Sequence, residues 1–427
     1  MKPLLELEKT LFNVEWKVIK IKRVLDTPIT DGPHETPELL DEGIPFLSAE
    51  SVKKGKLEFN LKRGYISQED HEKYIKKCKP QRDDIFMIKS GATTGNVAMV
   101  ETDEEFSIWS PLALIRADKE KILPKYLYYF IGSTAFKEQV EISWSFGTQQ
   151  NIGMKVIENL FISVPPLSAQ EKLVEYMEIK AVQIDKLIEM KEQEISLLEQ
   201  QRQSIITEAV TKGLNPNVKM KDSGVEWIGE IPEQWEVVKL GWFISIFGSV
   251  EITDGQYKAP LFKVNDLNMD KNKLYLNESN EIADNNIKPI SGNKILIPKR
   301  GAAIFTNKVR VVNVPCYIDS NLMAIVPKKE FRVEYLAYLL WARRLGDIAD
   351  TSTIPQINNK QINPLKVPLP TIKEQIEIVS SIETHSNQIL KLIQSIQLQI
   401  EKLKEYRQAL IYEAVTGKID VRDMELD

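Results

Sequence analysis

Two segments of this 427-residue chain, 205 positions apart, align without a gap, and each has the periodicity of a long amphipathic helix. Residues 165–214 and 370–419 are identical at 18 of 50 positions. The agreement is densest near their ends, where Glu208-Ala-Val-Thr recurs as Glu413-Ala-Val-Thr. A period this long is not that of a solenoid and indicates duplication of a larger unit. We therefore predict two similar halves related by pseudo-twofold symmetry.

Apolar residues in both segments recur at alternating spacings of three and four, which is the seam of a coiled coil. In the first segment they are Val174, Met177, Ala181, Ile184, Ile188, Ile195, Leu198, Ile205 and Ala209, and a matching series runs to Ala414 in the second. Arg202 and Arg407 occupy the same step of the two seams. Because a charge in a packed seam is costly, we expect these arginines to reach solvent or to mark where a partner docks. The simpler alternative is that the seam is only structural.

The ends of both segments carry helix signals. Each begins after proline and ends near a glycine, Gly213 or Gly417. Ser168 and Thr371 are expected N-caps, each with a glutamate three residues later that would complete a capping box. A helix over 168–211 is roughly 66 Å long, whereas the polar linker after it reaches at most ~45 Å. We therefore expect the helices to pair antiparallel, with a globular domain at each end.

The segments that precede the helices also correspond. Ile29-Thr-Asp-Gly matches Ile252-Thr-Asp-Gly, and Asp84-Ile-Phe-Met-Ile-Lys-Ser-Gly-Ala matches Lys294-Ile-Leu-Ile-Pro-Lys-Arg-Gly-Ala. Short β-branched runs between turn residues, such as 85–88, are typical of strands, and the regions around Tyr126 and Tyr335 are expected to form short helices. The fold class that follows is α/β (α+β). The expected segments are a first domain at 1–164, a helix at 165–213, a linker at 214–225, a second domain at 226–369, a helix at 370–419 and an acidic tail at 420–427.

Composition restricts the protein class only in part. No apolar run reaches the ~18–20 residues of a membrane span, and the two cysteines, Cys78 and Cys316, lie far apart, so we expect a cytoplasmic protein that does not contact a membrane. The formal net charge of −5 at first argues against nucleic acid, but the acidic excess lies mostly on the helices and tail. Local basic clusters decide binding, so the charge leaves the question open.

A search for catalytic motifs finds none. The chain has no GxxxxGK[ST] phosphate loop, no GxGxxG that opens a βαβ unit and no NPPY-type segment. Its three histidines are scattered, and His385 falls on the predicted coiled coil. We therefore expect no active site, metal or cofactor in this chain.

Two matched loops are the best candidates for binding. The loop after strand 85–88 combines glycines with hydroxyl, amide and amino groups that suit phosphates or base edges. The candidate DNA-binding residues are Lys53, Lys54, Lys89, Ser90, Thr93, Thr94, Asn96, Gln149, Gln150, Lys299, Arg300, Thr306, Asn307, Lys308 and Arg310. The simpler alternative for any single loop is a solvated turn. Two such loops in duplicated domains favour a reader of two half-sites.

Taken together, these features resemble the specificity subunit of type I restriction-modification systems, over essentially the whole chain. The most specific segment is the linker Lys221-Asp-Ser-Gly-Val-Glu-Trp-Ile-Gly-Glu-Ile-Pro-Glu-Gln-Trp-Glu-Val. Gly147-Thr-Gln-Gln-Asn-Ile, Pro165-Pro-Leu-Ser-Ala-Gln-Glu and Glu413-Ala-Val-Thr-Gly-Lys-Ile are also similar to segments of that family. The resemblance implies two target-recognition domains, each reading one half of a split, asymmetric sequence in double-stranded DNA.

The same resemblance implies partners. The paired helices would set the gap between half-sites and dock two methyltransferase subunits, which bind S-adenosylmethionine. Restriction (translocase) subunits would bring ATP- and Mg-dependent chemistry. The second half has Gly301-Ala-Ala-Ile and Ser352-Thr-Ile-Pro where the first has Gly-Ala-Thr-Thr-Gly and Gly-Thr-Gln-Gln, which suggests two different half-sites.

Two alternatives remain open from the sequence. The negative charge and the heptads also suit a coiled-coil scaffold that binds only proteins. A self-contained DNA methyltransferase is the third hypothesis, and the missing methyl-donor and catalytic motifs argue against it.

Overall fold

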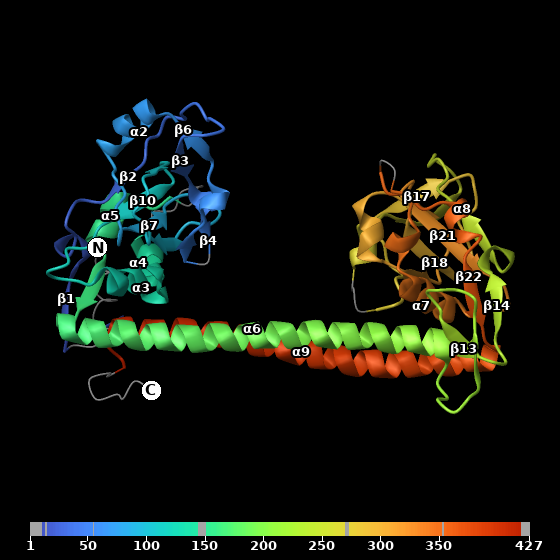
Figure 1. Ribbon diagram of the computed structural model, residues 1–427. Helices are drawn as coiled ribbons and strands as arrows, with labels where there is room; N and C mark the ends of the chain where they lie inside the picture. Colours follow the sequence, from blue (N-terminus) through green and yellow to red (C-terminus); the bar gives the residue numbers. More distant parts are fainter. Residues whose placement is uncertain are drawn as a thin grey trace. The chain divides into compact units, whose positions relative to one another are not determined.

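The chain divides into two compact units, each of which contains part of both long helices. The computed structural model describes residues 11–12, 15–53, 55–143, 151–269, 273–351 and 354–419. Unit 1 is 1–190 with 399–427, and unit 2 is 191–398. The two long helices are α6 (Leu167–Lys212) and α9 (Ile372–Thr416) (Figure 1). The expected limits of the domains stay a prediction, because the division into units cuts both helices.

Unit 1 is a mixed α/β domain. In its described part, β2, β10, β7 and β8 form an antiparallel sheet in that order, β6, β3 and β9 form a second sheet, and β1 pairs with β11. A hairpin joins β4 and β5. The strands are β1 (Lys17–Lys20), β2 (Thr30–Asp31), β3 (Ile44–Leu47), β4 (Val52–Lys53), β5 (Lys56–Leu57), β6 (Gly64–Ile66), β7 (Ile85–Ile88), β8 (Val97–Met99), β9 (Ser107–Ile108), β10 (Leu112–Ile115) and β11 (Phe161–Val164). The helices are α2 (Gln68–Ile75), α3 (Pro124–Gly132), α4 (Thr134–Ser143) and α5 (Met154–Asn159).

Unit 2 repeats this topology. The order β15-β21-β18-β19 corresponds to β2-β10-β7-β8, the order β17-β16-β20 to β6-β3-β9, and the pair β14–β22 to β1–β11. Even the parallel pairing recurs, of β3 with β9 and of β16 with β20. The strands are β12 (Met220–Asp222), β13 (Glu230–Pro232), β14 (Glu236–Lys239), β15 (Ile244–Phe247), β16 (Tyr257–Phe262), β17 (Ile282–Asn285), β18 (Lys294–Pro298), β19 (Arg310–Val312), β20 (Tyr317–Ile318), β21 (Leu322–Pro327) and β22 (Lys366–Leu369). The helices are α7 (Val333–Arg343) and α8 (Asn359–Ile362).

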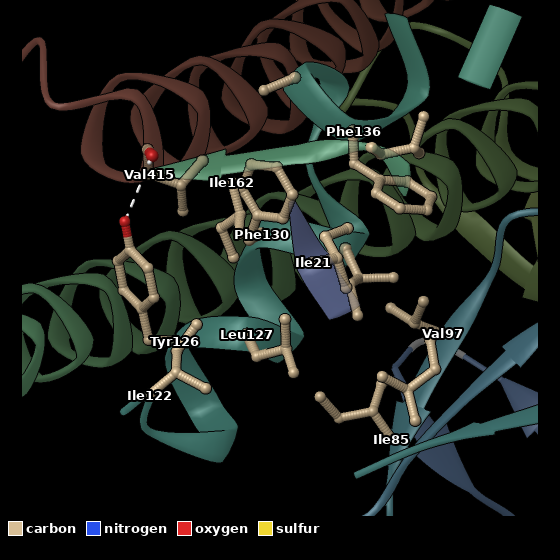
Figure 2. Close-up of a cluster of buried hydrophobic side chains, with 14 of the residues drawn as sticks. Ile21, Ile85, Val97, Ile122, Tyr126, Leu127, Phe130, Phe136, Ile162 and Val415 are labelled. Carbon is tan, nitrogen blue, oxygen red and sulfur yellow. Dashed lines mark hydrogen bonds between the residues drawn. The ribbon is translucent and has the colours of Figure 1, made fainter. Parts of the chain in front are cut away.

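The main core of unit 1 lies between the sheet and the long helices. Side chains of β7, α3 and β11 pack together in it, among them Ile85, Leu127 and Ile162 (Figure 2). The same core takes in Val174 and Met177 of α6, with Leu410 and Ala414 near the end of α9. Burial of this apolar surface at roughly 25 cal/mol per Å² is the main force that attaches the domain to the helices.

Unit 2 uses the opposite ends of the same two helices. Its core joins Ile206 and Val210 near the end of α6 with Ile378 and Ile382 near the start of α9. Apolar seams on the helices therefore serve two cores. In α9 the buried series includes Ile382, Ser386, Ile389, Ile393, Ile396, Ile400 and Leu410, which are the heptad positions that the sequence predicts.

A buried glutamine fixes each domain to the helix that follows it. In unit 1 the side-chain oxygen of Gln170 accepts a hydrogen bond from the Leu123 N–H at 2.8 Å, and its amide donates to the Pro165 and Lys121 carbonyls. Gln375 occupies the equivalent position of unit 2 and makes the same three contacts, with the Arg332 N–H at 2.7 Å and two carbonyls. Both side chains are fully buried. Each satisfies backbone groups at the start of α3 or α7.

A buried tyrosine attaches each domain to the other long helix. The Tyr126 hydroxyl donates to the Val415 carbonyl near the end of α9 (Figure 2), and the Tyr335 hydroxyl donates to the Val210 carbonyl near the end of α6 at 2.9 Å. Carbonyls in the last turn of a helix have no partner within the helix. The bond from Tyr335 satisfies the Val210 carbonyl, and the Val415 carbonyl accepts from the Ser163 hydroxyl at 2.6 Å as well as from Tyr126. Burial raises the pKa of Tyr335 well above its usual value, so the hydroxyl stays protonated, and remains a donor, even in alkaline solution.

The helix ends agree with the sequence in three places out of four. Thr371 caps α9 and forms the expected capping box with Glu374. Gly213 and Gly417 follow the last turns with positive φ, at 73° and 75°. The expected cap at Ser168 is wrong, because α6 already begins at Leu167, directly after Pro166. Within the described residues, no helix is long and apolar enough to cross a membrane.

Replacing Gln375 by Met should destabilise unit 2. The thioether fills a similar volume but leaves the Arg332 N–H and two carbonyls without partners, so we expect a loss of about 3 kcal/mol. Differential scanning calorimetry of the full chain measures it. Gln388→Met on the exposed side of α9 is the matched control, and equal effects of the two changes would contradict the role of Gln375.

Candidate nucleic-acid interface

The first candidate loop connects β7 to β8 and is held by its own backbone. The Ile88 N–H donates to the Asn96 carbonyl and the Gly95 N–H to the Ile88 carbonyl, at 2.9 and 2.8 Å. Gly91 and Gly95 have φ of 103° and 90°, and a Cβ at either would meet no atom within 4 Å. Backbone conformation therefore explains these glycines, and the loop tip faces open space. Thr93 and Asn96 are exposed on it, while the Thr94 hydroxyl donates to the Gly91 carbonyl.

A second segment runs beside this loop. Ser90 forms an isolated bridge with Asn151, and the Ile152 N–H donates to the Lys89 carbonyl at 2.8 Å. Gln149 and Gln150, which directly precede Asn151, lie outside the described residues.

Unit 2 has the same arrangement with different side chains. The loop between β18 and β19 begins at Lys299 and Arg300, and Arg300 forms an isolated bridge with Gln356. The Ile357 N–H donates to the Lys299 carbonyl at 2.9 Å, which reproduces the contact between Ile152 and Lys89. Two loops with little sequence in common are thus fixed by one pattern of backbone bonds.

A cavity of about 270 Å³ opens beside the second loop. Lys299 and Arg300 line it together with Phe247, Gln356 and Asn359. The last three are not among the residues predicted from the sequence. Gln356 could have been found, because it stands 205 residues after Asn151 in the repeat. Phe247 could not, since nothing in its local sequence indicates that its ring is 42% exposed at the end of β15.

The prediction that Lys89 contacts DNA is corrected by the structure, which places this side chain in a buried ion cluster. Its ammonium lies 2.9 Å from a carboxylate oxygen of Asp31, and Lys77 lies 2.5 Å from the other oxygen. Burial alone would raise the pKa of Asp31, but the hydrogen bonds from Lys77 and Lys89 outweigh it and hold that pKa below its usual range. Lys89 therefore anchors the start of the loop and does not offer a free cation to DNA.

The predicted DNA contacts of Asn307 and Arg310 are corrected for a similar reason. Asn307 adopts a left-handed conformation, and its side chain donates to the Trp341 carbonyl and accepts from the Leu345 N–H. Arg310 is 8% exposed in β19. Both side chains are engaged inside the domain. Thr306 is exposed but donates to the Ala303 carbonyl, and Lys308 is half-buried.

Of the remaining predicted basic pair, Lys53 lies in the β4–β5 hairpin. Lys53 is exposed opposite Lys56, and the hairpin packs against β8, the strand at which the first loop ends. Lys54 lies outside the described residues. The hairpin thus adds a cation near the loop.

The two seam arginines have different surroundings. Arg407 donates to the Asp185 carboxylate at 3.0 Å within unit 1. Arg202, within unit 2, lines a cavity with Trp341 and Ser386. Their docking role stays a prediction.

The described ranges contain no cluster of three or more His, Cys, Asp or Glu side chains able to hold a metal ion.

Duplicated α/β domains, long helices and paired loops are the architecture of a recognition protein. The family model described as "Type I restriction modification DNA specificity domain" matches residues 13–200 and 232–402. The chain belongs to this family and is a specificity subunit of a type I restriction-modification system, with two recognition domains and no catalytic role of its own.

Individual relatives agree with this assignment. The type I restriction enzyme MjaVIII specificity subunit of Methanocaldococcus jannaschii is 24% identical over 96% of this chain and 94% of its own length. A second protein of that organism, named for the MjaX enzyme, is 26% identical with the same coverage. One solved chain, from work described as "Structural basis underlying complex assembly and conformational transition of the type I R-M system", has a similar fold. Its TM-score is 0.69 at 18% identity, over 96% of this chain and 99% of that one.

Replacing Asp31 by Asn should destabilise unit 1 by about 3 kcal/mol at neutral pH, because it leaves the buried Lys89 ammonium without its counter-charge. The pKa of Asp31 is depressed in the folded protein, so the stabilisation is complete above the unfolded pKa and declines as pH falls through the folded one. The gap between wild type and variant should therefore shrink on acidification. Calorimetry from pH 7 to 3 measures it, with Asp41→Asn at an exposed site as control. A gap that does not change with pH would contradict the prediction.

Proposed function

We propose that each unit reads one half of a split, asymmetric sequence in double-stranded DNA through its paired loops. The observation that carries this is the common backbone frame of the two loops, in which the Lys89 and Lys299 carbonyls accept from Ile152 and Ile357. A constant frame with variable side chains is suited to reading different bases from one docking geometry. Because half-sites read by unlike loops differ, the target would be asymmetric.

The proposed contacts are the predicted loop and hairpin residues, together with the residues that line the cavity beside the second loop. In unit 1 they are Lys53, Lys54, Ser90, Thr93, Thr94, Asn96, Gln149 and Gln150, and in unit 2 Phe247, Lys299, Arg300, Thr306, Lys308, Gln356 and Asn359. Amides pair well with adenine and an arginine fork with guanine, while lysines serve the phosphates. We keep Lys89, Asn307 and Arg310 out of this set because their side chains are engaged within the domains.

The long helices are proposed to pair as an antiparallel coiled coil with pseudo-twofold symmetry that sets the gap between half-sites. In support, the Asp185–Arg407 pair and the contacts of Val174 and Ala414 join the early part of α6 to the late part of α9 within unit 1. Unit 2 joins the late part of α6 to the early part of α9.

The same helices would dock two methyltransferase subunits, with restriction subunits completing the complex. S-adenosylmethionine, ATP and Mg²⁺ would then bind to those partners and not to this chain. We propose a cytoplasmic location for this chain, because its proposed target is DNA and it is not expected to contact a membrane.

Arg300→Ala should weaken specific DNA binding and relax the preference at one base pair, at a cost of about 1–3 kcal/mol. Gel shifts with the methyltransferase complex, on the target and on single-base variants of it, measure both effects. Lys329→Ala removes an equal charge from an exposed site outside the loop and should leave binding unchanged. No sequence-selective binding by the wild-type complex would instead favour a scaffold that binds only proteins.

Inserting four residues, about one helical turn, near Gln394 in α9 should change the gap that the complex tolerates between half-sites. Methylation of a DNA series with stepped gaps measures this. If the tolerated gap stays the same, spacing is set by something other than the helices.

A further inference from the structure

A second cavity lies within unit 2, where the β18–β19 loop ends at β19. Its volume is about 240 Å³, and its walls come from both long helices, α7 and β19. The residues that matter here are Arg202 of α6, Arg310 of β19, Tyr338 and Trp341 of α7, and Ser386 of α9. Two guanidinium groups and two aromatic rings thus face one small space.

Arg202 has no carboxylate partner among the described residues. Its Nε is buried and makes no hydrogen bond there, and its guanidinium lies 6.0 Å from the Trp341 ring centroid. Burial lowers the pKa of Arg202, which reflects the cost of holding this charge away from water. Ser386 adds an independent observation, since it is 4% exposed and its hydroxyl also has no described partner. A half-buried cation with a buried Nε and a buried hydroxyl donor therefore meet at one cavity, both available to a ligand.

The other half of the repeat shows which group pairs with the equivalent arginine. Arg407, 205 positions after Arg202, donates from Nη1 to the Asp185 carboxylate at 3.0 Å, while its Nε, like that of Arg202, is buried without a hydrogen bond among the described residues. The position equivalent to Asp185 is Leu390, which carries no charge. The repeat therefore retains the arginine in both halves but the carboxylate in only one.

We propose that the cavity binds the carboxylate of an acidic side chain supplied by the methyltransferase partner. This rests on the proposed function for the identity of the partner. A carboxylate matches the guanidinium fork of Arg202 and accepts from the Ser386 hydroxyl. Tyr338 and Trp341 offer apolar faces to the aliphatic stem of such a side chain.

The acidic residues nearby favour a single carboxylate over a phosphate. Glu383 lines the same cavity but does not neutralise Arg202, since the two side chains form no ion pair. Burial and the neighbouring Glu334 raise the pKa of Glu383, so the rim already resists negative charge. A doubly charged phosphate would meet more of this repulsion than a carboxylate.

The test measures the affinity of the full-length chain for its purified cognate methyltransferase subunit by titration calorimetry. Arg202→Met should weaken binding roughly 30-fold or more, because the partner's carboxylate is then buried without its cation. Leu390→Asp should also weaken it, although Arg202 is intact, because the new carboxylate stands where Asp185 stands in the other half. Lys329→Met controls for loss of charge, and thermal unfolding of each variant checks its fold.

The outcomes separate the two levels of the proposal. Unchanged subunit affinity in both Arg202→Met and Leu390→Asp overturns the carboxylate site. Unchanged subunit affinity with weakened DNA binding assigns the cavity to a phosphate and equally overturns it. Failure of the wild-type chain to bind the subunit at all contradicts the proposed function itself.

Discussion

The structure depends on a pair of polar contacts that each unit makes with both long helices. A buried glutamine at the start of the following helix, Gln170 or Gln375, satisfies backbone groups where the domain meets that helix. A buried tyrosine, Tyr126 or Tyr335, donates to the last turn of the other helix. Apolar packing alone is tolerant of sliding, whereas these bonds exist at one position only and leave costly unpaired groups if lost. They therefore fix which turn of each helix a domain occupies.

Because these bonds fix each domain on the helices, the side chains of the recognition loops can vary. Because the glutamine, the tyrosine and the cores hold the frame of each unit, loop side chains can differ without altering how the loop is presented. The contact from Ile152 to Lys89 and its counterpart from Ile357 to Lys299 persist although the loops share few residues. The same reasoning explains why Lys89 is retained inside: it neutralises Asp31 and anchors the strand end from which the loop departs.

Much of the fold followed from sequence because duplication supplies each pattern twice. Strand 85–88, the helices around Tyr126 and Tyr335, the cap at Thr371 and the glycine stops could all be predicted from local chemistry. The cap at Ser168 could not, since Pro166 starts α6 earlier. The site was harder. Whether Lys89, Asn307 or Arg310 faces solvent depends on Asp31, on α7 and on the cavity walls, which are distant in sequence. Gln356 was within reach, because the repeat places it opposite Asn151.

The central claim is that two unlike loops on one frame read two different half-sites at a fixed separation. Profiling methylated positions across the source genome by single-molecule sequencing tests it most directly. We expect one motif made of two unlike short sequences, separated by an unspecified gap of constant length, and we expect it to disappear when the gene for this chain is deleted. A continuous motif, or methylation that persists without this chain, would contradict it.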